Sequence, residues 1–345
     1  MKYDLQKLKA FCAGIMQAAG LNDEDSEIFA ESLVNADARG VGSHGVTRLT
    51  AYSRRVAEGL ISADARPEIA EDGGSLLLVD ANNGIGAVTA KKVMDLCMER
   101  AKETGCCFAT VRAGNHFGYG AFFTEYAADK GMIGISLANA PCSMAPVGGR
   151  ESMLGTNPLS VAIPAGEYRP LVLDMATSVV ARGKITLAKK EGRTIPAGWG
   201  VDKNGVVTTD PGEVTAVLPF GGAKGYGIAL IIEILSSCLS GARPGKELTS
   251  MYDYTQVQNS GFFLGAVNIE KIMPLDLFKA SVDRLFASIK NSEKADGVKE
   301  IYLPGEIEFN KTVLSEREGV ELSGAVAAEL QALAERYHVP FNCAK

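Results

Sequence analysis

The sequence is poor in the residues that build metal sites and disulfide frameworks. Its 345 residues include 3 histidines and 7 cysteines, and no two cysteines form a CxxC pair. Zinc sites need closely spaced cysteine and histidine ligands, so no metal site is expected. An odd number of cysteines in mostly apolar surroundings is typical of free buried thiols in a reducing compartment. We therefore expect a cytoplasmic protein.

Long apolar runs and a strong excess of one charge are also missing. The longest apolar stretch, residues 228–235, contains Glu233 and is far shorter than the roughly 20 residues of a membrane span. The N-terminal residues carry charges throughout, unlike a signal peptide. The net charge of −6 is spread along the chain, which argues against a nucleic-acid surface. Neither a membrane nor a nucleic acid is an expected partner.

Common nucleotide-binding and hydrolase signatures are absent or misplaced. The GxxxxGK[ST] pattern of P-loop proteins and the GxSxG pattern of α/β-hydrolases do not occur. One GxGxxG pattern occurs at residues 40–45. In a Rossmann fold this pattern follows a strand, whereas here it follows a predicted helix. The pattern therefore does not predict a Rossmann dinucleotide site.

The pattern that is present is that of an α/β protein. Strand-like segments alternate with helical periodicity in the middle of the chain, at 75–81, 106–113 and 132–140. Further short apolar pieces predict strands at 159–165, 170–176 and 262–267. The spacing of apolar residues predicts helices at 3–19, from 22 or 23 to 40, and at 44–60, 179–191, 222–241, 276–292 and 321–337. The length suits two domains.

A glycine-flanked histidine, His44, is the first candidate for chemistry. Ser43 precedes it, in the N-cap position of the helix predicted at 44–60, and Arg48 and Tyr52 follow at helical spacing on the same side. The planar fork of an arginine can grip a carboxylate through two hydrogen bonds. A histidine can exchange a proton near neutral pH. The pair therefore suits a 2-oxo or 2-hydroxy acid, although a lone histidine at a helix start is often structural.

Three further segments are candidates for ligand binding. His116 directly follows a predicted strand, and ligands in α/β folds gather at the carboxyl ends of strands. Lys224 stands among glycines at a helix start, which predicts either an anion site or a solvated lysine in a turn. Residues 173–178 end a strand with an acid and two hydroxyls, which also suits a helix N-cap. His338 is expected to lie at the surface. These residues indicate an α/β enzyme that binds an anionic ligand.

Seven segments, in order, resemble one known family, the malate and L-lactate dehydrogenases that lack the usual Rossmann fold. The family also includes sulfolactate and ureidoglycolate dehydrogenases, diketogulonate reductase and a reductase of cyclic imino acids. The resemblance runs from about residue 5 to residue 340 and is carried by ADARGVGSHGVTRL, GNHFGYGAFFTEYAADKGMIGI, SMAPVGGRESMLGTNPLSVAIP, LDMATSVVARGKI, GWGVDKNGVVTTDP, GGAKGYGIAL and YLPGE.

The resemblance implies a non-Rossmann α/β fold with a mixed sheet core and a helical domain built from both termini. Residues 1–72 with 276–345 would form that helical, dimerisation and substrate-side domain, and residues 73–275 the cofactor-binding domain. It also implies a homodimer and the use of NAD or NADP. The expected activity is hydride transfer between nicotinamide and a small 2-hydroxy or 2-oxo carboxylic acid.

Carried over position by position, the resemblance implies three groups of site residues. Ser43 and His44 match the family's catalytic pair, and His116 matches an acid/base position of some members. The positions that match substrate contacts are Arg48, Thr156 and Arg182. The positions that match cofactor contacts are Phe117, Gly118, Gly120, Asp174, Met175, Ala176, Lys224, Gly225, Pro304, Gly305 and Glu306. If Glu306 lies near the adenosine ribose, its charge favours NAD.

Two departures from the family pattern bear on the substrate. Some members carry an aspartate where this chain has Thr186, which weakens an assignment to the cyclic imine reductases. Residues 139–144 also differ, in a stretch that could line the substrate pocket. The alternatives are therefore C=N reduction of a cyclic imino acid and a non-catalytic binding protein on the same fold.

Overall fold

The computed structural model describes residues 1–345 and begins with two capped helices, α1 (Leu5–Ala18) and α2 (Asp23–Ala38). The carboxylate of Asp4 accepts hydrogen bonds from the first N–H groups of α1. The side chain of Asn22 accepts one from Asp25 at the start of α2. These caps satisfy donors that have no partner within the helix. Both helices lie where the sequence predicts them.

The single helix predicted at 44–60 is wrong. Two short 3-10 turns, Gly42–His44 and Val46–Arg48, precede α3 (Leu49–Ala57). Gly45 interrupts them with an extended backbone (φ −86°, ψ −153°). The carboxylate of Asp37 accepts a hydrogen bond of 2.7 Å from the N–H of Val46. A Cβ atom at Gly45 would lie 2.1 Å from that carboxylate, so this turn requires glycine.

A seven-stranded sheet forms the centre of the molecule, in the order β2-β3-β4-β10-β5-β6-β7. Only β3 and β4 are parallel, and every other pair is antiparallel. This mixed sheet confirms the predicted fold class and differs from the mostly parallel sheet of a Rossmann domain. The strands are β2 (Glu68–Asp72), β3 (Leu76–Asp80), β4 (Cys106–Gly114), β10 (Ser260–Asn268), β5 (Met132–Ala138), β6 (Leu159–Ile163) and β7 (Leu171–Met175).

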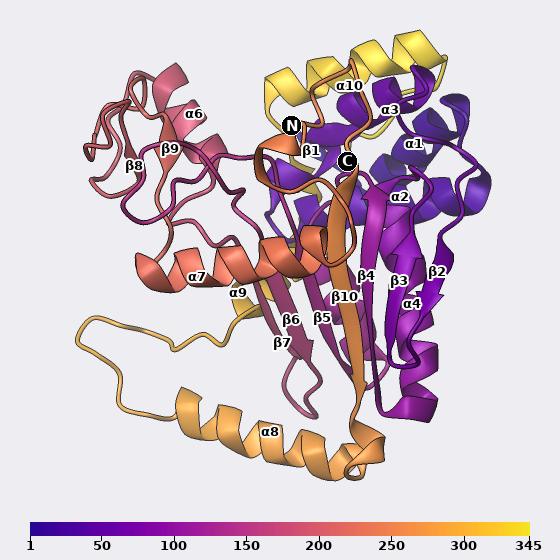
Figure 1. The fold of residues 1–345 in the computed structure, drawn as a ribbon, viewed down its shortest axis with the longest axis vertical. Helices are drawn as coiled ribbons and strands as arrows, with labels where there is room; N and C mark the ends of the chain where they lie inside the picture. The colour runs from indigo at the N-terminus through magenta and orange to yellow at the C-terminus, as the bar shows by residue number, and fades with distance from the viewer.

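Helices cover both faces of this sheet (Figure 1). Side chains alternate along a strand, and on β4 Cys107, Ala109 and Val111 join the main hydrophobic core with α4 (Gly86–Thr104) and α5 (Ala121–Asp129). Thr110 points the other way, and its hydroxyl donates to Leu235 in the π-helical turn that follows α7 (Ala223–Glu233). The sheet is therefore buried between two helical layers.

The two ends of the chain meet in the helical part. Strand β1 (Lys2–Tyr3) pairs with β11 (Val320–Glu321), and α10 (Gly324–Tyr337) lies beside α1 and α3. Helix α8 (Leu275–Lys290) agrees with the predicted helix at 276–292. Helix α9 (Glu306–Glu318) and strand β2 were not predicted. The proposed domain boundaries stay a prediction.

A smaller lobe carries α6 (Arg182–Lys190) with the short strands β8 (Gly200–Val201) and β9 (Ala216–Val217). It has its own buried cluster of 9 apolar residues, separate from the main core. Figure 1 shows this lobe beyond the sheet, on the side of α7. None of the helices combines the length and the apolar character that a membrane span requires.

The strand directions bring several loops to one end of the sheet. Strands β4, β5 and β7 end there, whereas β6 and β10 begin there, because their antiparallel pairing reverses their direction. His116 follows β4 and Asn139 follows β5 at this end. The sheet therefore gathers side chains from distant segments at a single edge, where a binding site can form.

Candidate active site

Two adjoining cavities lie at this end of the sheet. We call the first the histidine cavity: it measures about 280 Å³ and is lined by His44, Arg48, His116, Thr156 and Tyr252, among others. We call the second the aspartate cavity: it measures about 370 Å³ and is lined by Arg39, His44, Asp174, Gly305 and Glu308, among others. The two share His44, Gly118, Pro158 and Ala181. They therefore form one continuous cleft.

A third, larger hollow contains few side chains that could take part in catalysis. It measures about 790 Å³ and is lined mainly by glycine and valine residues of the segments 146–150, 198–207 and 218–222. Arg150 is its only charged side chain, and it contains no histidine. Size alone therefore does not identify the reactive site, and the cleft with the titratable groups is the candidate.

The two histidines face each other in the histidine cavity. Their rings stack with centroids 5.6 Å apart and planes inclined by 17°. The Nδ1 atom of His44 lies 2.9 Å from the hydroxyl of Ser43, and Nδ1 of His116 lies 2.5 Å from the hydroxyl of Tyr52. Each ring therefore has one nitrogen held by a hydroxyl, and its Nε2 is left for a ligand.

Burial keeps both histidines uncharged near neutral pH. It lowers the pKa of His44 to about 4, and the positive charge of Arg48 adds to this effect. The pKa of His116 is lowered well below its ordinary value by burial, with further contributions from His44 and Arg48. A neutral imidazole can accept a proton. The site therefore holds two potential bases beside a permanent cation.

Arg48 is positioned with part of its guanidinium group unused. Its Nε donates to the carbonyl oxygen of Ser43 at 2.7 Å, and its Nη1 donates to the hydroxyl of Tyr252. Its Nη2 has no hydrogen-bond partner in the protein. Thr156 lines the same cavity with its side-chain hydroxyl unpaired. These groups offer donors that a carboxylate can accept.

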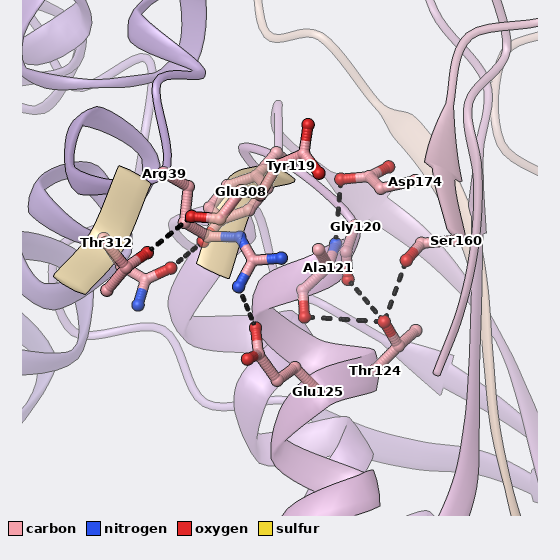
Figure 2. A network of polar contacts seen from close by, with 11 residues as sticks. Arg39, Tyr119, Gly120, Ala121, Thr124, Glu125, Ser160, Asp174, Glu308 and Thr312 are labelled. Carbon is pink, nitrogen blue, oxygen red and sulfur yellow. Dashed lines mark hydrogen bonds and ion pairs between the residues drawn. The ribbon is translucent and has the colours of Figure 1, made fainter. Parts of the chain in front are cut away.

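The aspartate cavity is built around Asp174, at the end of β7. Its Oδ2 atom accepts a hydrogen bond of 3.1 Å from the N–H of Ala121 (Figure 2). Burial of part of the side chain raises the pKa of Asp174 above its ordinary value, and the hydrogen bond from Ala121 opposes this shift. The carboxylate nevertheless reaches solvent, because it lies in the wall of an open cleft.

A buried ion pair supports the other side of the aspartate cavity. Figure 2 shows Arg39 reaching toward Glu125, with Nη1 and Oε2 2.6 Å apart. Glu308 lines the cavity without any ion-pair partner. Gly118 adopts a φ of +88°, and a Cβ atom added there would meet nothing within 4 Å. Because its backbone faces open space in both cavities, an elongated ligand can lie across it.

The structure brings most of the predicted site residues together. The histidine cavity is lined by His44, Arg48, His116, Phe117, Gly118, Thr156 and Ala176. The aspartate cavity is lined by Ser43, His44, Gly118, Gly120, Asp174, Pro304 and Gly305. These twelve positions come from separate segments between residues 43 and 305. Their roles as catalytic, substrate or cofactor contacts stay predictions.

Five predicted residues do not line either cavity. Arg182 donates from Nη2 to the carbonyl oxygen of Val214 at 3.0 Å. Glu306 pairs with Lys290 at 2.8 Å, so its charge is already engaged. The remaining three are Met175, Lys224 and Gly225, of which Lys224 is exposed.

The sequence did not predict several of the residues that line the histidine cavity. Met251 and Tyr252 belong to the loop before β10, which has no recognisable pattern. The wholly buried Arg55 holds this loop, because its guanidinium group donates to the carbonyl oxygens of Asp253 at 2.5 Å and Gln256 at 3.1 Å. Tyr52, the hydrogen-bond partner of His116, was a supporting residue that the sequence did indicate. Its spacing predicted that it lies on the same side as His44 and Arg48.

The fold and the cleft together define a non-Rossmann α/β protein with paired histidines beside an arginine. A family model described as malate/L-lactate dehydrogenase matches residues 3–331. The chain belongs to this family.

Individual relatives agree with this assignment. The chain is 37% identical over 345 residues to a malate dehydrogenase of Pyrococcus abyssi, covering 96% of this chain and 94% of the relative. It is 34% identical over 323 residues to the NAD(+) ureidoglycolate dehydrogenase of Escherichia coli, covering 93% of each. Among solved structures, the sulfolactate dehydrogenase of Methanocaldococcus jannaschii superposes with a TM-score of 0.93 at 36% identity, covering 98% of each chain.

Proposed function

We propose that the protein is an NAD(P)-dependent dehydrogenase that transfers a hydride between nicotinamide and a small 2-hydroxy or 2-oxo carboxylic acid. One observation carries the proposal: the stacked pair His44 and His116 lies in the same cavity as the unused Nη2 of Arg48. A proton-transfer group beside a carboxylate clamp is what the interconversion of these acids requires.

Each side chain has a distinct task in this proposal. Arg48 binds the carboxylate and orients the carbon that reacts. His44 or His116 takes the hydroxyl proton during oxidation and returns it during reduction. Ser43 and Tyr52 hold the two rings through Nδ1. The substrate contact predicted for Thr156 suits its unpaired hydroxyl, whereas that of Arg182 needs a different side-chain position from the one observed.

The aspartate cavity suits the nicotinamide cofactor, which supplies or accepts the hydride. It meets the histidine cavity at His44 and Gly118, and the open backbone of Gly118 leaves room for a ligand that spans both. Gly120, Asp174, Pro304 and Gly305 would contact it from the cavity walls. The contacts predicted for Met175, Lys224, Gly225 and Glu306 lie outside this cavity and stay predictions.

We further propose that NAD is preferred over NADP. Asp174 and Glu308 place two carboxylates in the aspartate cavity, and the charge of Arg39 is balanced by Glu125. A 2′-phosphate would be repelled by this surplus of negative charge. In this proposal Glu308, and not Glu306 as the sequence predicted, is the carboxylate that disfavours NADP. We expect Glu308→Gln to raise the use of NADP relative to NAD, and equal use by the unmodified protein contradicts the proposal.

Single substitutions of the two histidines test the main proposal. We expect His44→Ala or His116→Ala to lower turnover of 2-oxo acids by roughly 10²-fold or more, followed as NADH absorbance. Near-normal turnover in both variants contradicts it.

The same assay with cyclic imino acids tests C=N reduction, and binding of cofactor without any turnover supports a non-catalytic protein. Thr186 donates to the carbonyl of Arg182 within α6 and supplies no carboxylate to the histidines.

We also propose that the protein is a homodimer. Helix α7 and the turn after it expose apolar side chains, with Ile231 58% and Ile234 47% exposed. Contiguous exposed apolar surface of this kind is typical of subunit interfaces. We expect light scattering to give twice the monomer mass, and Ile231→Glu to give a monomer. A monomeric unmodified protein contradicts the proposal.

A cytoplasmic location is proposed from the thiols. All 7 cysteines are free, and Cys12, Cys97, Cys107 and Cys343 are buried. Free buried thiols persist in reducing compartments. Fractionation of the source cells, with the protein detected by an antibody, tests this, and recovery from a secreted or periplasmic fraction contradicts it.

A further inference from the structure

We propose, on the basis of the function proposed above, that the substrate carries a single carboxylate and that its remaining substituent is small and uncharged. Dicarboxylic and sulfonated 2-hydroxy acids would then be poor substrates. The proposal rests on the charges of the histidine cavity. Arg48 is the only permanent cation among the 18 residues that line it, and none of them is a lysine, an aspartate or a glutamate.

The two side-chain amides of the histidine cavity are engaged with the protein. The amide of Asn139 donates to Glu233 at 3.3 Å and to the carbonyl of Arg243 at 2.9 Å, while its oxygen accepts from Gly261 at 3.0 Å. Gln258 accepts from the N–H of His116 and donates to the carbonyl of Thr249, both at 3.1 Å. Neither amide is free to bind a second anionic group.

A buried carboxylate lies directly behind this wall. Glu233 is 4% exposed and accepts hydrogen bonds from Asn139, Asn157 and the N–H of Gly245. Its contacts do not include a lysine or an arginine side chain. A carboxylate held only by neutral donors repels a second negative charge in the cavity. This effect adds to the lack of a second cation.

The cations outside the cavity are held elsewhere. Arg182 donates from Nη2 to Val214 and keeps its Nη1 buried without a partner, Lys246 pairs with Glu151 at 2.9 Å, and Arg243 donates to Gln256 and Val257. The rest of the cavity wall includes Ala138, Ala140, Pro141 and Ala176, which are small and apolar. Such a wall accepts a hydrogen atom or a short alkyl group without loss of hydrogen bonds. The site thus recognises one carboxylate and excludes a second.

A panel of 2-oxo acids with NADH tests this charge rule on the unmodified protein. We expect kcat/KM for pyruvate and 2-oxobutyrate to exceed that for oxaloacetate and sulfopyruvate by roughly tenfold or more, because a second anion in the cavity would be unpaired. Preference for oxaloacetate or sulfopyruvate overturns the proposal. No turnover with any acid contradicts the dehydrogenase function itself, so the two failures are distinguishable.

Two matched variants isolate the charge. We expect Ala140→Lys to raise the ratio of oxaloacetate to pyruvate turnover at least severalfold, because it adds a cation to the wall. Ala140→Met adds a side chain of similar length without charge, and we expect it to leave that ratio unchanged. An equal change of the ratio in both variants overturns the proposal. If oxaloacetate is preferred and Arg182→Gln removes the preference, Arg182 is the second cation and the proposal is equally overturned.

Discussion

The hydroxyl group of Tyr52 lies 2.5 Å from Nδ1 of His116 and 3.1 Å from the carbonyl oxygen of the same residue. A carbonyl oxygen can only accept a hydrogen bond. When the hydroxyl donates to it, Nδ1 must carry the proton that it donates to the hydroxyl. The Nε2 atom of His116 is then unprotonated. Tyr52, which is almost wholly buried, thereby sets which nitrogen can receive a substrate proton.

Replacing Tyr52 by phenylalanine removes this hydrogen bond with little change in volume. We expect kcat to fall about tenfold or more, because His116 loses its fixed tautomer and orientation, with little change in KM. The pH profile of kcat should move as well. Tyr337→Phe is the control, because its hydroxyl donates to Ser53 away from the cleft. Unchanged kcat and pH profile in Tyr52→Phe contradict this role.

Replacing Arg48 by lysine tests the carboxylate clamp. Lysine keeps the charge but lacks the planar fork, so we expect KM for the acid to rise by about 10- to 100-fold. The KM for the nicotinamide cofactor should stay near its normal value. Arg317→Lys serves as the control, because Arg317 is exposed, pairs with the neighbouring Glu318 and lines neither cavity. Equal effects of both substitutions, measured by steady-state kinetics, speak against the clamp.

The lowered histidine pKa values predict an unusual pH dependence. Oxidation needs an unprotonated base, and the pKa of His44 is about 4, below its ordinary value of 6.5. We therefore expect kcat/KM for oxidation to stay level from about pH 8 to about pH 6 and to fall only as the pH approaches 4. Rates should be compared only where circular dichroism shows an intact fold.

The pH at which kcat/KM begins to fall tests whether a buried histidine with a lowered pKa is the base. A fall in kcat/KM that begins near the ordinary histidine pKa of 6.5 shows that burial does not lower the pKa of the ring that acts as the base. Arg48→Gln supplies a second check, because removing the neighbouring positive charge raises the pKa of both rings. The inflection of this variant should therefore move to higher pH.

Asp37 predicts how stability depends on pH. Burial raises its pKa to about 7, and the hydrogen bond from Val46 opposes part of this shift. Because the folded-state pKa exceeds the ordinary value of 3.8, its contribution to stability is complete below about pH 4. That contribution is lost as the pH rises through about 7.

Asparagine in place of Asp37 cannot ionise. We therefore expect the Tm of Asp37→Asn, relative to the unmodified protein, to improve between about pH 5 and about pH 8. Thermal unfolding followed by circular dichroism measures the difference. Asp23→Asn, on the exposed surface of α2, is the control. The prediction fails if the difference in Tm is the same at both pH values.

Short-range patterns in the sequence predicted much of the fold. The strands β3 to β7 and the helices α1, α2, α8 and α10 follow from apolar spacing and caps, which depend on neighbouring residues. The break at Gly45 could not be predicted, because it depends on the carboxylate of Asp37 beneath it. Helix α9 has no strongly amphipathic face, and none of its residues is buried. The spacing of its apolar residues therefore did not indicate a helix.

The sequence by itself determined the family, the α/β class and the identity of His44, His116 and Arg48 as candidates. Only the tertiary structure decided how they meet. The central strand β10 places the loop with Tyr252 beside Arg48, 204 positions away along the chain. The tertiary structure also shows that Glu306 pairs with Lys290, whereas Glu308 lines the cleft. Contacts of this kind depend on strand order and packing, which local patterns do not encode.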